Sequence, residues 1–362
     1  MSDFKDHPLD GAEQLGRRWS AHLDDYVVAA AWSAGEQTLA TASLRGEIAF
    51  FAPGSEKPNI CHDSIHAPGM NSLSWHPRHP LLASSGQDGQ IKIWSEGKLC
   101  SQLETRDSWI EKVVWSPDGQ WLAAAAGREI YLWELRGMEQ FELHLVSHEH
   151  VYILTDIAWR PWQRSNPSPP EIAAACHGQI SFWQPNKHDP SRLLMRKGSP
   201  LPIAWSPDGR YLVCGVQDGT LHLWAFPSER ELSMSGYPEG IRALAWDSTS
   251  RFLASSCESD IRIWDLNGQR LEVSEPIGLE AHLYSITALA FQKCEPLLAS
   301  GGPDGLLVVC NPFAGQNTLF FDYYKKKISC LCWSGHENYL VVGTADGLIT
   351  LYDNPVAIQA RG

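Results

Sequence analysis

The chain has 362 residues, of which 43% are hydrophobic and 20% charged, and its formal net charge is −13 at pH 7. This acidic balance argues against sequence-independent binding of nucleic acid, which rests on a basic patch, and against docking on anionic membranes. The polar start of the chain lacks the apolar run of a secretory signal, and no apolar stretch reaches the roughly 18 residues that a membrane span needs. Nine scattered cysteines without CxxC pairs are typical of a reducing compartment, so we expect a cytoplasmic location.

One segment with an aromatic residue near its end recurs eight times along the chain. The aromatic anchors of the eight copies are Trp32, Trp75, Trp115, Trp159, Trp205, Trp246, Phe291 and Trp333. Neighbouring anchors are 40 to 46 residues apart. A nearly constant period of this length indicates a repeat architecture, in which each copy is one supersecondary unit.

The copies share an internal pattern, which the second copy shows clearly. Its small-residue strand LLASSG (81–86) is followed by an Asp-Gly turn at 88–89 and by the alternating strand QIKIW (90–94). A looser strand, KLCSQLET (98–105), then precedes the next anchor. Short alternating segments bounded by Gly, Asp and Pro turns predict four antiparallel strands per copy, and no stretch has the sustained periodicity of a helix.

The repeated pattern resembles the WD-repeat (WD40) family of β-propellers over residues 16–353. The signature dipeptide stands once, as Trp264-Asp265, and Tyr352-Asp353 is a near variant. The resemblance implies an all-β fold, namely a single eight-bladed β-propeller of four-stranded antiparallel blades. Seven blades are the alternative if one of the anchors is degenerate.

The resemblance also implies how the ring closes. In the family the strands of a blade are named a to d from the central channel outwards, and the anchor strand is a. The last copy supplies only strands a, b and c, so we expect GRRWSAH (16–22) to provide its outer strand and to close the ring. Residues 1–15 and 354–362 are then an N-terminal and a C-terminal tail around one propeller domain, 16–353.

In the family, a histidine nine residues before the anchor shares a structural hydrogen-bond network with a strand-b Ser or Thr, a turn Asp and the strand-c Trp. The second copy has all four members, His66, Ser84, Asp88 and Trp94. The seventh copy has His282, Ser300 and Asp304, with Cys310 where the Trp is expected. The resemblance therefore implies that these residues stabilise turns.

The segment 141–159, FELHLVSHEHVYILTDIAW, is dense in histidine. His150 lies nine residues before Trp159, which predicts a structural role, and His144 is expected to face solvent on an outer strand. In the fourth copy a histidine replaces the turn Asp and follows a cysteine. Two alternatives stay open: a hydrogen-bond network based on histidines, or a zinc site at the rim of the fourth blade. The candidate zinc ligands are His148, His150, His177 and Cys176.

The top face of WD-repeat propellers, made of the d–a and b–c turns, is their usual docking surface. The candidates for partner binding on this face are Tyr26, Trp109, Glu111, Arg242 and Lys327. Tyr26 and Trp109 are large aromatics at turn positions, and aromatic side chains often anchor interfaces. The alternative for Trp109 is burial beneath its neighbour Trp121 or the next blade.

No nucleophile elbow, zinc-protease motif or phosphate-binding loop occurs in the sequence. We therefore expect a non-catalytic interaction scaffold that binds a protein or peptide on its top face and forms a monomeric fold unit. No cofactor is expected apart from the possible zinc. Metal handling is the main alternative, and an enzyme with an active site at the mouth of the channel is a weaker one.

Overall fold

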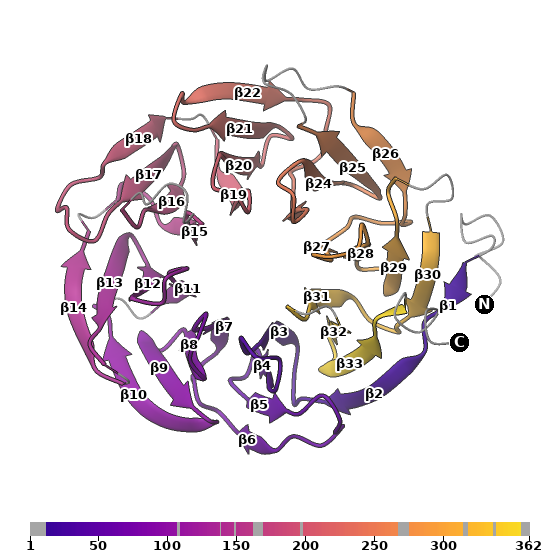
Figure 1. The fold of residues 1–362 in the computed structure, drawn as a ribbon, viewed down its shortest axis with the longest axis horizontal. Helices are drawn as coiled ribbons and strands as arrows, with labels where there is room; N and C mark the ends of the chain where they lie inside the picture. The colour runs from indigo at the N-terminus through magenta and orange to yellow at the C-terminus, as the bar shows by residue number, and fades with distance from the viewer. Residues whose placement is uncertain are drawn as a thin grey trace.

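The computed structural model describes residues 12–106, 109–137, 139–147, 150–161, 169–195, 198–266, 275–313, 318–335 and 338–355. Within these ranges the chain forms eight sheets, each with four antiparallel strands, arranged as blades around one axis (Figure 1). The prediction of an all-β, eight-bladed propeller is confirmed. The seven-bladed alternative is wrong, because every anchor, including Phe291, lies on an inner strand of its own. The described ranges contain no helix long and apolar enough to cross a membrane.

Each blade, numbered 1 to 8 along the chain, contributes one strand to each of four positions, a to d outwards. The inner strands a are β3 (Val27–Trp32), β7 (Met70–Trp75), β11 (Ile110–Trp115), β15 (Leu154–Trp159), β19 (Pro200–Trp205), β23 (Leu244–Trp246), β27 (Ala288–Phe291) and β31 (Ile328–Trp333). Strands b are β4 (Leu39–Ser43), β8 (Leu81–Gly86), β12 (Trp121–Ala126), β16 (Ile172–Cys176), β20 (Tyr211–Val216), β24 (Phe252–Cys257), β28 (Leu298–Gly301) and β32 (Tyr339–Thr344). Strands c are β5 (Ile48–Phe51), β9 (Gln90–Ser95), β13 (Glu129–Leu135), β17 (Gln179–Trp183), β21 (Leu221–Ala225), β25 (Asp260–Asp265), β29 (Leu306–Cys310) and β33 (Leu348–Asp353). The outer strands d are β6 (Ile60–His62), β10 (Lys98–Glu104), β14 (Phe141–Val146), β18 (Arg192–Met195), β22 (Arg230–Met234), β26 (Ile277–Glu280), β30 (Thr318–Tyr323) and, for blade 8, β2 (Arg17–His22).

Strand β12 explains why the second strand of each copy is rich in small residues. All six of its residues are buried. Ala123 and Ala125 belong to the apolar cluster shared with blade 4. Ala124 and Ala126 belong to the cluster shared with blade 2. Because successive side chains of a strand point to opposite faces, both faces of this strand pack against a neighbouring blade, and small residues let the blades approach near the axis.

The anchor tryptophans link each blade to the preceding one. In five of them the indole Nε1 donates a hydrogen bond of 2.9 to 3.3 Å to a backbone carbonyl of the preceding inner strand. These bonds run from Trp75 to Ala31, Trp159 to Val114, Trp205 to Ala158, Trp246 to Ala204 and Trp333 to Ala290. The Nε1 atoms of Trp32 and Trp115 have no hydrogen-bond partner in the described part of the chain. The anchor of the repeat therefore combines apolar packing with a directed bond between blades.

The N-terminal strand β2 closes the ring, as the sequence predicts. It pairs antiparallel with β33, with Trp19 opposite Leu351, and lies outside that strand in Figure 1. Arg17 forms an ion pair of 2.6 Å with the buried carboxylate of Asp322 in blade 7. The same carboxylate accepts a hydrogen bond from the hydroxyl of Tyr352 in β33. The closure thus joins blades 7 and 8 through polar contacts as well as through strand pairing.

Residues 13–15, which the sequence analysis placed in the N-terminal tail, extend blade 7. The short strand β1 (Glu13–Gln14) runs parallel to β30, with Glu13 opposite Phe320. Leu15 is buried in the apolar cluster between blades 7 and 8. The outer edge of a sheet has unpaired backbone groups that can accept a further strand, and the chain passes this edge on its way to β2. A strand of two residues has no alternating pattern by which the sequence could indicate it.

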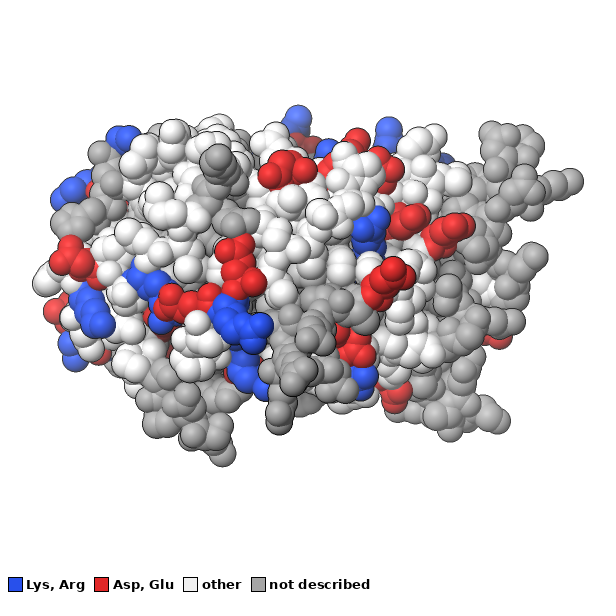
Figure 2. All heavy atoms as spheres, turned by 90° about the horizontal axis from the view of Figure 1, so that it is seen from above, with Lys and Arg blue, Asp and Glu red and all other residues white. Residues whose placement is uncertain are grey.

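Figure 2 shows one edge of the disc, on which acidic and basic side chains lie next to one another. On this side the charged residues are interspersed and do not gather in one patch of a single sign. Exposed ion pairs contribute little to binding or stability, so the apolar groups on the faces of the disc are a better guide to function.

Candidate partner-binding surface

Among the large apolar side chains exposed on the top face, the face formed by the d–a and b–c turns, four lie in the turns before blades 3 and 4, and the others are Leu44, Leu283 and Tyr284. Val151, Tyr152 and Ile153, in the d–a turn before blade 4, have exposed fractions of 70%, 49% and 64%. Trp109, in the d–a turn before blade 3, is 45% exposed. We name Trp109 and residues 151–153 the blade 3–4 surface. Trp109 is therefore not covered by Trp121, which lies at the far end of β12 and packs edge-on against His144.

Backbone hydrogen bonds hold the two turns of this surface together. The amide of Gly127, in the b–c turn of blade 3, donates to the carbonyl of Trp109 at 3.2 Å. The amide of Leu154 donates to the carbonyl of Gly127 at 2.9 Å. A pocket of about 540 Å³ lies between Trp109 and Ile153, so the two side chains line one depression. The surface is thus built on fixed backbone, which lowers the entropy lost when a partner binds.

Glu111 fixes the orientation of the Trp109 indole. The register of β11 against β12 shifts between Ile110 and Lys112, which makes Glu111 the extra residue of a β-bulge. A bulge redirects the side chain it carries, and here the Glu111 carboxylate accepts a hydrogen bond of 2.7 Å from Nε1 of Trp109. The apolar face of the indole and one acidic group are therefore presented together.

The surface continues toward blade 5 through His177. The His177 ring packs edge-on against Tyr152, with ring centroids 4.8 Å apart. Its Nδ1 is hydrogen-bonded to the hydroxyl of Ser199 at 2.8 Å. His177 is thus a neighbour of the exposed apolar turn.

The structure does not bring together the described members of the predicted zinc site. His150 is buried, its Nδ1 donates to the carbonyl of Arg128, and its Nε2 accepts from the hydroxyl of Ser181, both at 2.8 Å. Burial raises the pKa of the Cys176 thiol, which opposes formation of the thiolate that binds zinc. The ligand atoms of His150, His177 and Cys176 do not all lie within 4.8 Å of one another, and His148 lies outside the described residues.

In the described ranges, one cluster does have the spacing of metal ligands. It consists of Glu47, Cys61 and Asp63 in blade 1. The Cys61 thiol donates a hydrogen bond of 3.1 Å to Glu47. Burial and the neighbouring carboxylates raise the pKa of Cys61 to about 12. The protonated thiol therefore satisfies the carboxylate without a metal ion.

The structural networks implied by the family resemblance are present as hydrogen bonds. Nδ1 of His66 donates to Asp88 at 2.9 Å, and its Nε2 accepts from Ser84 at 2.8 Å. Trp94 donates its indole proton to the same Ser84 oxygen at 2.9 Å. In blade 7, the buried His282 contacts Asp304 and Ser300, each at 2.9 Å. Cys310, in place of the Trp, donates to the carbonyl of Leu298 at 3.7 Å.

A network of this kind in blade 6 was not predicted from the sequence. Tyr237 stands nine residues before Trp246, the position of the family histidine, and shares a hydrogen bond of 2.6 Å with Ser255. The indole of Trp264 donates to the Tyr237 hydroxyl at 2.8 Å. The nine-residue spacing could have revealed this substitution, because a tyrosine hydroxyl both donates and accepts, as a neutral imidazole does.

The remaining candidates for partner binding lie elsewhere on the top face. Lys327 and Tyr26 meet at the junction of blades 8 and 1, where the ammonium is 5.9 Å from the centroid of the half-buried ring. Arg242 is exposed just before β23 in blade 6. The structure therefore pairs Trp109 with Glu111 and Tyr26 with Lys327, but it places the two pairs and Arg242 in different blades around the ring.

The family model WD40, described as "WD domain, G-beta repeat", matches residues 60–95, 97–134, 203–225, 228–265, 274–311 and 316–353. These segments make up more than half of the sequence, and the chain belongs to the WD40 repeat family. No matched segment covers residues 135–202, which include the exposed turn before blade 4. The blade 3–4 surface is thus partly formed by a section of the chain that the family model does not match.

Two relatives and one solved structure illustrate the similarity. WD repeat-containing protein srw1 of Schizosaccharomyces pombe is 28% identical over 155 residues, which cover 42% of this chain and 27% of that protein. Regulatory-associated protein of TOR 1 of Arabidopsis thaliana is 22% identical over 334 residues, which cover 83% of this chain and 24% of that protein. The chain thus spans about a quarter of the length of these relatives. The computationally designed Ika8 protein superimposes with a TM-score of 0.77 at 19% identity, covering 93% of this chain and 99% of that chain, and shows likeness of fold alone.

Proposed function

We propose that this chain is a non-catalytic interaction module that binds a protein or peptide segment at the blade 3–4 surface. One observation carries the proposal: Trp109, Val151, Tyr152 and Ile153 are exposed on rigid, hydrogen-bonded turns of one face. Large apolar side chains that are grouped on the surface of a soluble protein mark interaction sites. Aromatic residues contribute much of the binding free energy at such sites. One relative, regulatory-associated protein of TOR 1, is named for its association with another protein, which supports a role of this kind.

The test is capture of binding partners from an extract of the source cells by the immobilised chain. We expect Ile153→Asp to reduce the captured partner about tenfold or more, because it places a charge in the apolar depression beside Trp109. Leu283→Asp is the matched control, since Leu283 is equally an exposed aliphatic residue in a d–a turn, before blade 7. Equal capture by both variants would contradict the proposed surface.

We also propose that the protein is cytoplasmic, a location that the nine cysteines without CxxC pairs support. Fractionation of the source cells should recover the chain with the soluble cytoplasmic proteins. Recovery in a secreted or membrane fraction would contradict this location.

A further inference from the structure

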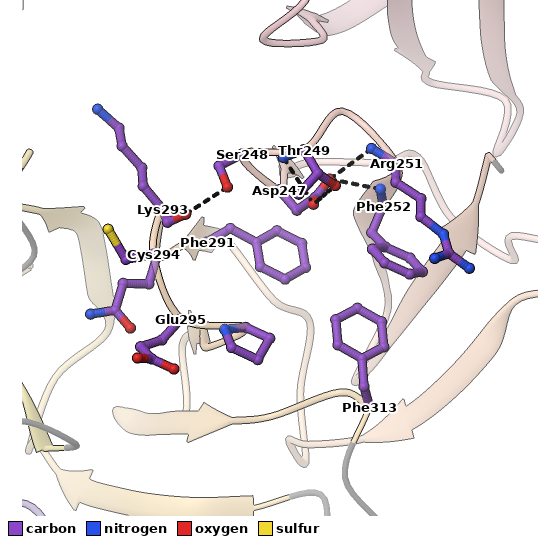
Figure 3. A pocket seen from close by; sticks show the side chains of 12 residues that line it. Asp247, Ser248, Thr249, Arg251, Phe252, Phe291, Lys293, Cys294, Glu295 and Phe313 are labelled. Carbon is purple, nitrogen blue, oxygen red and sulfur yellow. Dashed lines mark hydrogen bonds between the residues drawn. The ribbon is translucent and has the colours of Figure 1, made fainter.

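A second depression lies on the bottom face, opposite the proposed docking surface, where the a–b and c–d turns of blades 6 and 7 meet. This blade 6–7 pocket has a volume of about 450 Å³. The side chains of Phe252, Phe291 and Phe313 surround it from three sides (Figure 3). Phe291 is buried at its base, whereas Phe313 is 41% exposed at its mouth. An exposed aromatic ring beside two others is an apolar site that is more stable when it is covered.

The walls of the blade 6–7 pocket are fixed by contacts within the protein. The hydroxyl of Ser248 donates to the carbonyl of Lys293 at 2.5 Å, which ties the a–b turns of the two blades together. The guanidinium of Arg251 lies 4.6 Å from the centroid of the Phe252 ring and forms two hydrogen bonds, of 2.8 and 2.7 Å, with Asp265. The two basic lining residues, Arg251 and Lys293, are balanced by the two acidic lining residues, Asp247 and Glu295.

The course of the N-terminal segment directs the chain before Glu13 to the same side of blade 7. Because β1 runs parallel to β30 with Glu13 opposite Phe320, residues before Glu13 leave in the direction of residues before Phe320. That direction leads to Phe313, in the turn between β29 and β30. In Figure 1 β1 lies beside β30, on the outer side of blade 7.

The length of the segment is sufficient to reach the pocket. Phe313 is seven residues from Phe320, so the two are separated by no more than about 24 Å of extended chain. Phe4 is nine residues from Glu13, and nine residues can span about 30 Å. Adjacent strands are only about 5 Å apart, so Phe4 can reach the mouth of the pocket from its attachment at β1.

The chemistry of residues 1–11, MSDFKDHPLDG, complements the pocket. The segment has one aromatic residue, Phe4. Its ring can stack against the phenylalanines that line the pocket. We propose that the chain's own N-terminal segment, residues 1–11, docks on the bottom face with Phe4 in the blade 6–7 pocket.

Disulfide trapping in the full chain tests this docking. Cys294 lines the pocket, so a cysteine introduced by Lys5→Cys can form an intramolecular disulfide with it in a glutathione buffer. The equilibrium yields the effective concentration of one thiol at the other. We expect Phe4→Ala to lower this effective concentration about tenfold or more, since it removes the buried ring, and Phe313→Ala to do the same from the protein side. Leu9→Ala truncates a large aliphatic residue of the same segment and should leave the effective concentration unchanged within about twofold.

Two controls keep the test specific. Cys294→Ser must abolish the disulfide, and peptide mapping must assign the bond to position 294 and not to the exposed Cys61 of blade 1. The proposal is overturned if Phe4→Ala and Phe313→Ala both leave the effective concentration unchanged. It is also overturned if the disulfide joins two molecules in proportion to protein concentration, because the occupant would then be a second copy of the chain.

Discussion

His76 shows how burial and backbone hydrogen bonds fix the protonation state of a side chain. Its Nδ1 accepts hydrogen bonds from the amides of Arg78 and His79, and its Nε2 donates to the carbonyl of Gly119 in blade 3. A proton on Nδ1 would break the hydrogen bonds from the two amides. Only the neutral tautomer with its proton on Nε2 therefore fits. Burial accordingly lowers the pKa of His76 to about 4.

This pKa predicts a loss of stability in mild acid. An unfolded histidine titrates near pH 6.5, so between about pH 6.5 and 4 the unfolded chain binds a proton that His76 in the folded chain does not. The free energy of unfolding should therefore fall as the pH decreases through this window, by about 1.4 kcal/mol per pH unit from this residue. Urea denaturation at pH 7.0, 5.5 and 4.5 measures the slope. His76→Gln should lower stability at pH 7.0 but show a shallower slope, and an equal slope in both proteins would contradict the assignment.

Two other buried histidines should also lower the stability of the protein in mild acid. Burial lowers the pKa of His66, against the opposing effect of Asp88, and it lowers the pKa of His150. Both residues hold turns between an outer strand and the next inner strand. At the residue scale, His66, His76 and His150 are structural groups whose lowered pKa values keep them neutral while the fold is intact.

At the scale of the element, the anchor tryptophans offer a matched comparison. Trp75→Phe removes the hydrogen bond to Ala31, whereas Trp115→Phe removes an indole N–H without a partner among the described residues. Phe291 shows that an inner strand can end in phenylalanine. We expect Trp75→Phe to lower the free energy of unfolding by about 1 kcal/mol more than Trp115→Phe does. Urea denaturation of both variants measures the difference, and equal losses would contradict a stabilising role of the inter-blade bond.

The strands could be predicted from the sequence because each element occurs eight times. A single alternating pentapeptide is a weak signal, but the same order of anchor, small-residue strand, short polar turn and alternating strand repeats with a nearly constant period. The two-residue strand β1 occurs once and has no such repetition. The exposure of Val151–Ile153 could not be predicted either, because an apolar run in a turn has the same sequence whether it is covered or open.

At the scale of the whole molecule, the ring depends on its closure. Burial alone would raise the pKa of Asp322, but hydrogen bonds from Arg17 and Tyr352 hold it below its usual value. Arg17→Met should therefore leave the buried Asp322 carboxylate without its ion-pair partner. The free energy of unfolding should fall by about 2 kcal/mol or more. Thermal or urea unfolding measures this loss. The double variant Arg17→Met, Asp322→Asn should recover part of the stability, and a single variant as stable as the parent would contradict a role of this pair in closure.

At the same scale, the frame of the blades and the proposed binding surface depend on different residues. The blade frame could be predicted because it depends on repetition, whereas the functional surface depends on residues that differ between blades. Trp109 is exposed, as its type and turn position led us to expect, but its role in binding stays a prediction. The zinc site is not supported, because His150 occupies the turn-stabilising position and His177 lies against Tyr152. Which rim residues meet in space follows from turn conformations that no periodic pattern specifies.

The central claim is that a partner binds the top face at blades 3 and 4, and the amide hydrogen-exchange footprint of the partner complex tests it most directly. The account predicts slower exchange on binding in the turns that carry Trp109, Gly127 and residues 151–154, with no change in the a–b and c–d turns of the bottom face. Protection confined to the bottom face, or to blades remote from blades 3 and 4, would contradict it.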